Sequence, residues 1–435
     1  MAKRPYQISK IENLFWLPRI QNNYAEAYYS LMLKFGNRVR INLPFKGFYF
    51  FHPNDVQKIL QSKPDEIYKS NLYEPYKSVL GEGIVTAEGS EWKKQKKQIG
   101  PKFHPKHLSG YIGVFDEIAR QQLEVWRKQD DIDISFASLA MTLEALGASL
   151  MGRDFNDILA KMSRGIEGCL VYANTHITNP LYPPGWVPTP INKEYKIAKR
   201  LLDEGISQII ADCEAGKMQG TLIEEIIQSE QNGEFATGYA FYQLCTLLFA
   251  GHDTTAVALS WAVANLTDEM QAAIASEAEQ LDHLEGPIGT QDVRKLRYTN
   301  AVFMETLRLF PPVPAIAKRI HNGFQPFSDT EIFPEESIFI VPYVTHRHPD
   351  FWQDPLVFNP ERFLQKSVDM SAFIPFSGGQ RGCLGENFAL IEGTLFLARM
   401  CQYFKISKLS DVPPSAPAAT LKMKQHLRAK ITPRK

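Results

Sequence analysis

Cys383 stands in a stretch of chain that is unusual for an ordinary buried thiol. Residues 376–385 read F-S-G-G-Q-R-G-C-L-G, so glycines surround the cysteine and Arg381 lies two residues before it. Glycine lets a backbone pass where side chains would collide or where a positive φ is needed. Residues 386–399 follow directly, are largely apolar and predict a long helix. A sulfur at the start of that helix is favoured as a thiolate by the positive end of the helix dipole, which indicates a metal ligand.

Two interpretations of this loop are open from its residues. Most free cysteines are small buried hydrophobic residues, which is the simpler interpretation. The order F-x-x-G-x-R-x-C-x-G resembles the haem-binding loop of the cytochromes P-450, the haem-thiolate monooxygenases. This resemblance implies a haem cofactor (heme b, iron protoporphyrin IX) with Cys383 as its axial thiolate, a ligation that favours O–O cleavage. It also implies that Phe376 packs near the sulfur, that Arg381 meets a haem propionate and that Gly385 belongs to the cofactor loop.

A second group of polar residues interrupts an apolar helix predicted over residues 242–265. Gly251, His252, Asp253 and two threonines follow one another there. An acid and hydroxyls inside a buried helix are costly unless they are hydrogen-bonded, and glycine with threonine tends to open a helix locally. The alternative interpretation is a harmless kink whose side chains are satisfied.

Residues 250–255, A-G-H-D-T-T, resemble the A-G-x-[DE]-T-T segment of the same family. The resemblance implies an oxygen-binding groove in which Thr254 orients a water and Asp253 feeds protons inward, an acid–alcohol relay. Gly251 is assigned to the cofactor pocket on the same grounds. His252 occupies the variable position of the segment, so we expect it to have a structural or solvent-facing role.

Glu305 and Arg308 lie three residues apart, a spacing that places them on one helix face. Most such pairs are exposed, but the apolar neighbours of this pair indicate burial. The pair resembles the E-x-x-R helix of the family, and Arg362 stands in a P-E-R-F loop that resembles the partner segment. The resemblance implies a structural network of Glu305, Arg308 and Arg362 behind the haem.

Haem propionates need cations nearby. Further residues of this sequence match the positions at which the family supplies them. Trp92 and Lys96 lie one helical turn apart where the family usually has W-x-x-x-R, so lysine keeps the charge but loses the bidentate fork. Arg319 matches the position of a further propionate arginine. The lysines near residue 96 can simply form a solvated helix face. Alternatively, they attract an acidic redox protein through a docking patch of Lys93, Lys94, Lys97, Lys102 and Lys106.

Length and composition set the fold class and exclude some partners. The chain has 435 residues and is 44% hydrophobic, so it can bury a large core. It carries 48 basic and 48 acidic residues, and this balanced charge gives no indication of nucleic-acid binding. The five cysteines lack paired spacing, which predicts a reducing, cytoplasmic environment without disulfides. We see no apolar N-terminal run of roughly 18–20 residues, so no integral membrane segment or anchor is expected.

Periodicity along the chain predicts a mostly α fold. Helical spacing dominates residues 109–310, with a proline-rich interruption at 179–190 between helices expected at 155–175 and 193–216. Residues 38–51 predict a β-hairpin that turns at 44–46. These patterns indicate a large helical region with a smaller β-rich lobe. The resemblance implies the cytochrome P-450 fold, with the haem between two central helices. Residues 1–435 are expected to form a single haem domain without a fused reductase.

The substrate is expected to be lipophilic. The resemblance places several apolar residues over the distal face of the haem, although each of them can equally be core packing. These chamber residues are Leu72, Tyr73, Val79, Leu80, Phe249, Ala250, Ala315 and Ile316.

The resemblance implies a monomeric monooxygenase that oxidises a fatty acid, terpenoid or steroid. It would use dioxygen and electrons from an external ferredoxin or flavodoxin-type partner with its reductase. A peroxide-driven or isomerising enzyme would keep the same haem loop, but the intact Asp253–Thr254 pair disfavours it. A non-catalytic haem-binding sensor belongs to another class, and the complete proton relay argues against it.

Overall fold

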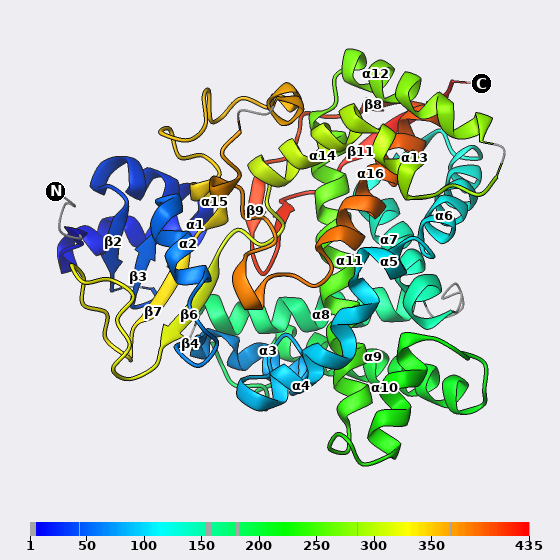
Figure 1. Ribbon diagram of the computed structural model, residues 1–435. Helices are drawn as coiled ribbons and strands as arrows, with labels where there is room; N and C mark the ends of the chain where they lie inside the picture. The colour runs from blue at the N-terminus through cyan, green and yellow to red at the C-terminus, as the bar shows by residue number, and fades with distance from the viewer. Residues whose placement is uncertain are drawn as a thin grey trace. The chain divides into compact units, whose positions relative to one another are not determined.

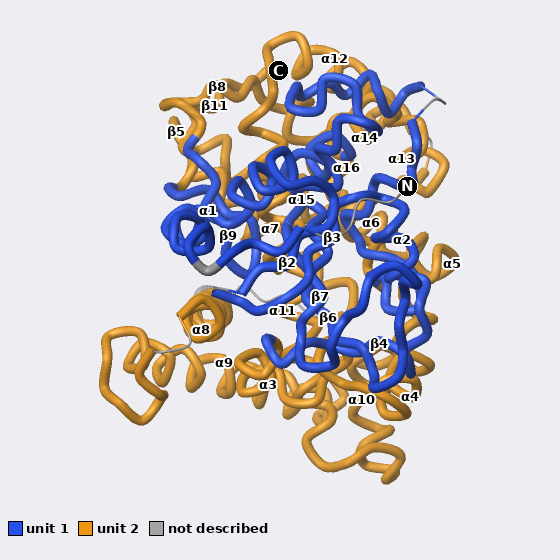
Figure 2. The backbone as a smooth tube through the Cα atoms, turned by 90° about the vertical axis from the view of Figure 1, so that its left-hand side faces the viewer, with its two compact units in different colours: residues 1–72, 304–383, 413–425 blue, residues 73–303, 384–412, 426–435 orange. Residues whose placement is uncertain are grey.

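The computed structural model describes residues 6–42, 44–152, 159–179, 182–284, 286–365 and 368–434. Within this range the chain forms two compact units, which Figure 2 shows in different colours. Unit 1 comprises residues 1–72, 304–383 and 413–425, and unit 2 comprises residues 73–303, 384–412 and 426–435. Each unit is therefore assembled from segments that lie far apart in the sequence.

Unit 1 is built on a six-stranded sheet with the strand order β1-β2-β3-β7-β6-β4. β2 and β3 form the antiparallel hairpin that the sequence predicts, while Leu43 lies outside the described residues. β3 is buried along its whole length, which is why it reads as consecutive aromatic residues rather than as an alternating pattern. The strands are β1 (Tyr6–Gln7), β2 (Arg38–Ile41), β3 (Gly47–Phe50), β4 (Ile67–Lys69), β6 (Ile316–Ile320) and β7 (Ser337–Ile340).

The helices of unit 1 lie around this sheet and fix its loops. Their bounds are α1 (Lys10–Phe35), α2 (Pro53–Leu60) and α15 (Pro342–Thr345), with the last residues of α14 (Arg297–Leu309) and a small sheet of β9 (Ser415–Pro417) and β10 (Leu421–Met423). α1 begins with a capping box, in which Ser9 and Glu12 each accept the other's backbone N–H. Val56, Ile59 and Leu60 of α2 belong to the same apolar cluster as the sheet residues, so α2 is firmly seated.

Unit 2 holds most of the helices. They are α3 (Glu74–Leu80), α4 (Gly89–Ile99), α5 (Pro105–Leu108), α6 (Ile112–Trp126), α7 (Ile134–Met151), α8 (Leu159–Thr178), α9 (Pro190–Glu214), α10 (Leu222–Gln231), α11 (Tyr239–Asn265), α12 (Asp268–Glu279), α13 (Thr290–Lys295) and α16 (Glu386–Tyr403). A three-stranded antiparallel sheet of β5 (Asp131–Asp133), β11 (Arg428–Pro433) and β8 (Phe404–Lys408) completes the unit. The mostly α fold with a smaller β region is thus confirmed.

Helix α11 is the central helix of unit 2. It lies beside α7 and α16 (Figure 1), and nearly all of its residues from 243 to 264 are buried. A helix that is apolar on all sides is typical of such an interior position. Among the described residues, α7 is the one helix long and apolar enough to cross a membrane, and 78% of it is buried inside the protein.

The two predicted helices around the proline-rich segment correspond to α8 and α9, while residues 155–158, Pro180 and Leu181 lie outside the described residues. The loop between the two helices is closed by one buried side chain. The Asn192 amide donates hydrogen bonds to the carbonyls of Pro183, Pro184 and Val187 at 3.1, 2.9 and 2.9 Å. Prolines cannot bond to one another through N–H groups, so this amide satisfies the carbonyls instead.

Candidate active site

The loop that carries Cys383 is held tightly within unit 1. The Cys383 N–H donates to the Phe376 carbonyl at 2.9 Å, and a 3-10 turn over Gly379–Arg381 lies between them. Ser377 and Gly379 adopt left-handed φ values of 62° and 64°. A Cβ on Gly379 would lie 2.0 Å from the carbonyl oxygen of Leu60 in α2. The glycine is therefore required both by its φ and by the close approach of the loop to α2.

Cys383 differs from the other cysteines in its exposure. It is exposed, whereas Cys169, Cys213, Cys245 and Cys401 are buried. Burial raises the pKa of the Cys169 and Cys401 thiols to about 12, and it also raises the pKa of Cys213 and Cys245. These four thiols stay protonated at neutral pH. Cys383 is the cysteine whose position suits an external metal ligand.

The ion-pair network behind this loop is fully buried at its centre. Arg308 donates to both Glu305 oxygens at 2.7 and 2.8 Å, and neither side chain is exposed to solvent. Arg362 donates to Glu305 Oε1 at 3.1 Å. A further Arg308 nitrogen donates to the His346 carbonyl at 2.8 Å. Burial lowers the pKa of Arg308, and the Glu305 carboxylate opposes that shift, so the pair is held together by its own charges.

His346 joins this network to the cysteine loop, a role that the sequence analysis did not assign. Its Nδ1 lies 3.0 Å from the Arg308 carbonyl, and its Nε2 accepts from the Ile374 N–H at 2.8 Å. Burial lowers the pKa of His346 to about 3, so the ring is neutral and donates through Nδ1. In the sequence, His346 is visible only as the first histidine of the run H-R-H-P. That run does not indicate which segments the ring connects.

The polar residues of α11 lie in unit 2. Asp253 is buried with an exposed fraction of 2%, and Thr254 is half-buried and donates its hydroxyl to the Ala250 carbonyl at 2.8 Å. His252 is buried, and its carbonyl accepts the Thr142 hydroxyl of α7 at 3.0 Å. Because the His252 side chain is buried, the solvent-facing alternative is wrong.

The expected opening of this helix is not seen, because α11 runs without a break from Tyr239 to Asn265. A Cβ on Gly251 would lie 2.7 Å from Leu146 Cδ1, so the glycine is explained by the close packing of α7 on α11. The Thr142 hydroxyl from α7 also supports the backbone at this point. Packing thus keeps the helix continuous over a stretch whose composition by itself predicts a break.

The predicted propionate cations have partners inside their own units. In α4, the Lys96 ammonium lies 5.2 Å from the centroid of the buried Trp92 ring. In unit 1, Arg319 of β6 donates to the Pro334 carbonyl at 3.3 Å and to Asn71, and lies over the Tyr68 ring. Arg381 is half-buried. The contacts of Arg319 hold its guanidinium against β6 and its neighbours, which suits a fixed anionic group.

The predicted chamber residues differ in exposure. Val79, Leu80 and Phe249 are buried at 1%, 3% and 7%, which is typical of packing residues. The remaining residues are partly or fully exposed, namely Leu72, Tyr73, Ala250, Ala315 and Ile316.

Tyr76 was not singled out by the sequence analysis. It lies in α3, and its pKa is raised by burial first and then by the charges of Tyr73 and Asp253. Its ring centroid lies 6.1 Å from that of Tyr73. The phenol is thus within electrostatic reach of the Asp253 carboxylate. The neighbours of Tyr76 in the chain, Glu74, Pro75, Lys77 and Ser78, form no pattern that marks this position.

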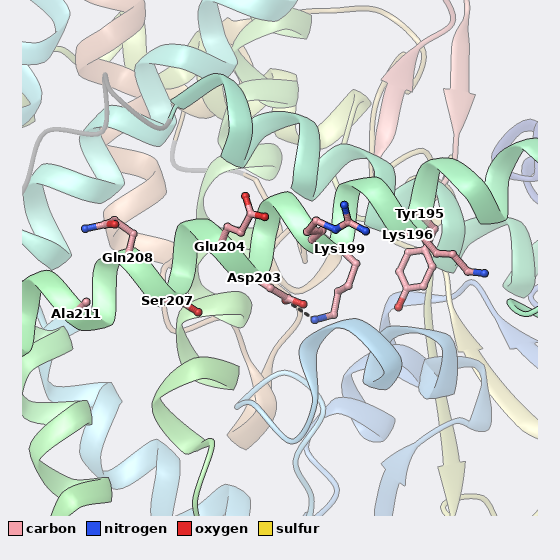
Figure 3. Close-up of a pocket in the computed structure, with 9 residues that line it drawn as sticks. Tyr195, Lys196, Lys199, Asp203, Glu204, Ser207, Gln208 and Ala211 are labelled. Atoms are coloured by element: carbon pink, nitrogen blue, oxygen red, sulfur yellow. Dashed lines mark hydrogen bonds and ion pairs between the residues drawn. The ribbon is translucent and has the colours of Figure 1, made fainter.

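An open groove of about 820 Å³ lies along α9, and Figure 3 shows its lining. The lining described here comes from α9 and is mostly charged, with an ion pair between Lys199 and Asp203. Among the lining residues described, none is one of the predicted chamber residues.

Comparison with known proteins gives the family. Residues 3–431 match the family model for cytochrome P-450. The chain belongs to the cytochrome P-450 family. It is 29% identical over 379 residues to cyclooctatin synthase of Streptomyces melanosporofaciens, covering 83% of this chain and 81% of the relative. It is 27% identical over 420 residues to cytochrome P-450 4Z1 of Homo sapiens, covering 89% and 83%.

A plant relative extends the comparison over more of the chain. The protein is 26% identical over 442 residues to Protein LUTEIN DEFICIENT 5, chloroplastic, of Arabidopsis thaliana, covering 93% of this chain and 73% of the relative. The match over nearly the whole length makes this chain a cytochrome P-450 monooxygenase.

The residues present fit the haem that the family implies. An exposed thiol projects from a loop that is closed by its own backbone hydrogen bond and seated on α2. Among the described residues no group of three or more His, Cys, Asp or Glu side chains could hold a metal ion. A porphyrin supplies four ligands of its own, so a single thiolate is sufficient.

We predict that Cys383→Ala abolishes thiolate ligation. The reduced carbon-monoxide complex should lack its red-shifted Soret band, because the remaining thiols are buried and cannot replace the sulfur. Cys213→Ala, which removes one of the buried thiols, should keep the band. A Cys383→Ala protein that still shows the band would contradict the ligand assignment.

We predict that Glu305→Gln is strongly destabilising. The change leaves the Arg308 guanidinium buried without its anion, at a cost of about 3–5 kcal/mol. The matched control is Glu124→Gln, because Glu124 pairs with Arg127 at the same i,i+3 spacing but is 64% exposed. That change should cost less than about 1 kcal/mol. Chemical denaturation followed by circular dichroism measures both, and equal costs would refute the network's structural role.

Proposed function

We propose that this cytochrome P-450 inserts an oxygen atom into a lipophilic small molecule, a fatty acid, terpenoid or steroid. The observation that carries the proposal is the exposed Cys383 thiol on its fixed loop, in a chain that also has the Asp253–Thr254 pair. Cys383 would hold haem b as the axial thiolate, and Arg381, Arg319, Trp92 and Lys96 would meet its propionates. When bound, the haem supplies the iron that activates dioxygen.

The side chains of α11 would deliver the protons that the reaction consumes. Oxygenation with dioxygen consumes two electrons and two protons, because one oxygen atom leaves as water. Thr254 offers a half-buried hydroxyl whose own hydrogen is directed to the Ala250 carbonyl, so its oxygen lone pairs are left to accept a proton donor. Asp253 lies next in the chain as a buried acid that would pass protons inward.

The chamber residues support a lipophilic substrate. Leu72, Ala315 and Ile316 are apolar and partly exposed, and Ala250 is exposed on α11. Tyr73 and Tyr76 add two phenols, so a substrate with a single hydroxyl or carbonyl group would find a hydrogen-bond partner. A peroxide-driven reaction remains the second candidate function, but it would not need the Asp253–Thr254 pair.

A binding screen tests the substrate class. Haem-loaded protein should show a ligand-induced shift of the Soret band with members of a panel of fatty acids, terpenoids and steroids. Each fatty acid is paired with its methyl ester, which separates a need for the carboxylate from a need for the chain. Products are then identified with a surrogate ferredoxin and reductase. Oxygenated product with peroxide alone, and none with the electron donors, would favour the second candidate.

We predict that Thr254→Ala uncouples the reaction. Product formed per NAD(P)H consumed should fall several-fold and hydrogen peroxide should rise, because proton delivery loses its hydroxyl. Thr175→Ala is the matched control, since Thr175 of α8 makes the same 2.8 Å back-bond to the carbonyl four residues earlier. Unchanged coupling in Thr254→Ala would count against the relay.

The electron donor would be an external ferredoxin or flavodoxin. Of the five lysines in the docking patch, Lys94 already bonds the Glu234 carbonyl and Lys102 pairs with Glu225 at 2.5 Å. Lys97 and Lys106 are exposed, and neither forms an ion pair within the part of the chain that the structure describes. They are the better candidates for contact with an acidic protein.

We predict that the double change Lys97→Glu and Lys106→Glu slows reduction by an acidic ferredoxin. At low salt kcat/KM for the ferredoxin should fall by about tenfold or more, since steering charges act on the association rate. The loss should shrink as salt rises. Lys430→Glu, an exposed lysine on β11, is the control and should have little effect. Equal rates in the double variant and the wild type would place docking elsewhere.

A further inference from the structure

One side of helix α9 in unit 2 is exposed from residue 193 to residue 214. The exposed residues recur at alternating intervals of four and three, which is the repeat by which two helices pack side by side in a coiled coil. We call this set the α9 stripe, and it consists of Lys193, Ile197, Arg200, Glu204, Ser207, Ala211 and Glu214. The opposite side of α9 packs into unit 2, through buried residues such as Ala198, Leu202 and Ile209.

The α9 stripe borders a hollow in the surface. Arg200, Glu204, Ser207 and Ala211 all line the open groove of about 820 Å³ that runs along α9 (Figure 3). Ile197, in the same stripe, is 45% exposed although it is a large apolar residue. Most charged helix faces are simply solvated, which is the alternative interpretation of this surface. A hollow beside an exposed isoleucine instead offers room and apolar area for the side chains of another molecule.

The two charges at the centre of the stripe are unpaired. Arg200 and Glu204 stand four residues apart, a spacing that allows an ion pair. Within the described residues, however, neither side chain forms an ion pair or a hydrogen bond. Their neighbours Lys199 and Asp203 have the same spacing and do pair. Arg200 and Glu204 are therefore available to charges that come from outside the chain.

The charges are ordered along the stripe so that it complements its own reverse. Lys193 and Arg200 come before the centre, and Glu204 and Glu214 come after it. A second α9 stripe can lie antiparallel on the first, with a twofold axis between residues 200 and 204. Arg200 of each copy then faces Glu204 of the other. A second copy is thus the partner that the order of charges specifies, because symmetry gives it the complementary charges in reverse.

The same register gives the stripe close contacts on both sides of these ion pairs. It places Ile197 of one copy opposite Ser207 of the other, and Lys193 opposite Ala211. The small side chains let the two helices approach closely, and the isoleucine buries apolar area. Because the stripe is mostly polar, the gain is modest, so the expected pair is weak, reversible and sensitive to salt.

We infer that two copies of this chain associate through their α9 stripes, antiparallel and about a twofold axis. This association differs from the monomer that the resemblance implies. It is independent of the proposed function, since the stripe contains none of the residues assigned to the haem, the protons, the substrate or the electron donor.

Sedimentation of the haem-loaded protein tests the association. At low salt the wild type should form dimers as its concentration rises, and added salt should dissociate them. Arg200→Glu and Glu204→Arg each set like charges against each other across the axis, so the dissociation constant should rise by about tenfold or more in either variant. Lys128→Glu is the matched control, because it reverses an exposed charge away from α9 and should associate as the wild type does.

A mixture of the two variants separates ion pairing from general charge repulsion. Arg200→Glu chains carry only glutamates at the centre of the stripe, and Glu204→Arg chains carry only arginines. Mixed in equal amounts, they should form a heterodimer at wild-type affinity, since both ion pairs are restored. The inference is overturned by a wild type that stays monomeric at low salt, by single variants that keep wild-type affinity, or by a mixture that associates no better than its components.

Disulfide trapping tests the register. In the double variant Ile197→Cys with Ser207→Cys, a mild oxidant should produce a covalent dimer on a non-reducing gel. The two positions lie about 15 Å apart along one helix, so the new thiols cannot bond within a chain. Ile197→Cys with Ala211→Cys is the control, because it is out of register across the axis and should cross-link far less. Equal cross-linking of both double variants would rule out this antiparallel register.

Discussion

A thiol that binds a cofactor must face outward while the chain that carries it is held still. In unit 1 this demand is met by the close seating of the Cys383 loop on α2, where Gly379 approaches the Leu60 carbonyl too closely for any side chain. Leu60 is itself a member of the apolar cluster of the sheet. The position of the sulfur is therefore determined by the core of the unit and not by the loop alone, because a rigid loop needs a rigid support.

A second support reaches the loop from behind. Arg308 is held by Glu305, and its carbonyl is bonded to His346, whose other ring nitrogen accepts from Ile374, two residues before Phe376. Each member depends on the next, since the neutral imidazole can donate on one side and accept on the other. The buried ion pair of the E-x-x-R helix thus supports the cysteine loop through a chain of hydrogen bonds and not through a direct electrostatic interaction.

Unit 2 contains buried acids in two different settings. Asp116 is paired with Arg399, whereas within the described residues neither carboxyl oxygen of Glu392 has a hydrogen-bond partner. A buried carboxylate whose charge is fully paired stays ionised, which suits a structural role. Incomplete compensation keeps an acid able to gain or lose a proton, which serves chemistry. The two kinds of buried acid in this protein therefore differ in their partners more than in their burial.

Much of the fold and of the candidate site could be predicted from the order of residues in the sequence. The run 376–385, the A-G-H-D-T-T segment and the E-x-x-R and P-E-R-F motifs each specify their residues locally, so Cys383, Asp253, Thr254, Glu305, Arg308 and Arg362 could be named without a structure. The mostly α fold and the hairpin of β2 and β3 follow from periodicity, which is also a local property.

Tertiary structure decided what depends on neighbours distant in the chain. Gly251 predicts a break in α11, yet Leu146 and Thr142 of α7 keep that helix continuous. The hydrogen bonds of His346, and the burial of Glu392 without a hydrogen-bond partner among the described residues, arise from residues brought together by folding. The sequence by itself determined which groups can react. Only packing decided which of them are exposed, paired or kept neutral, because solvation and hydrogen bonding are set by whatever surrounds an atom in space.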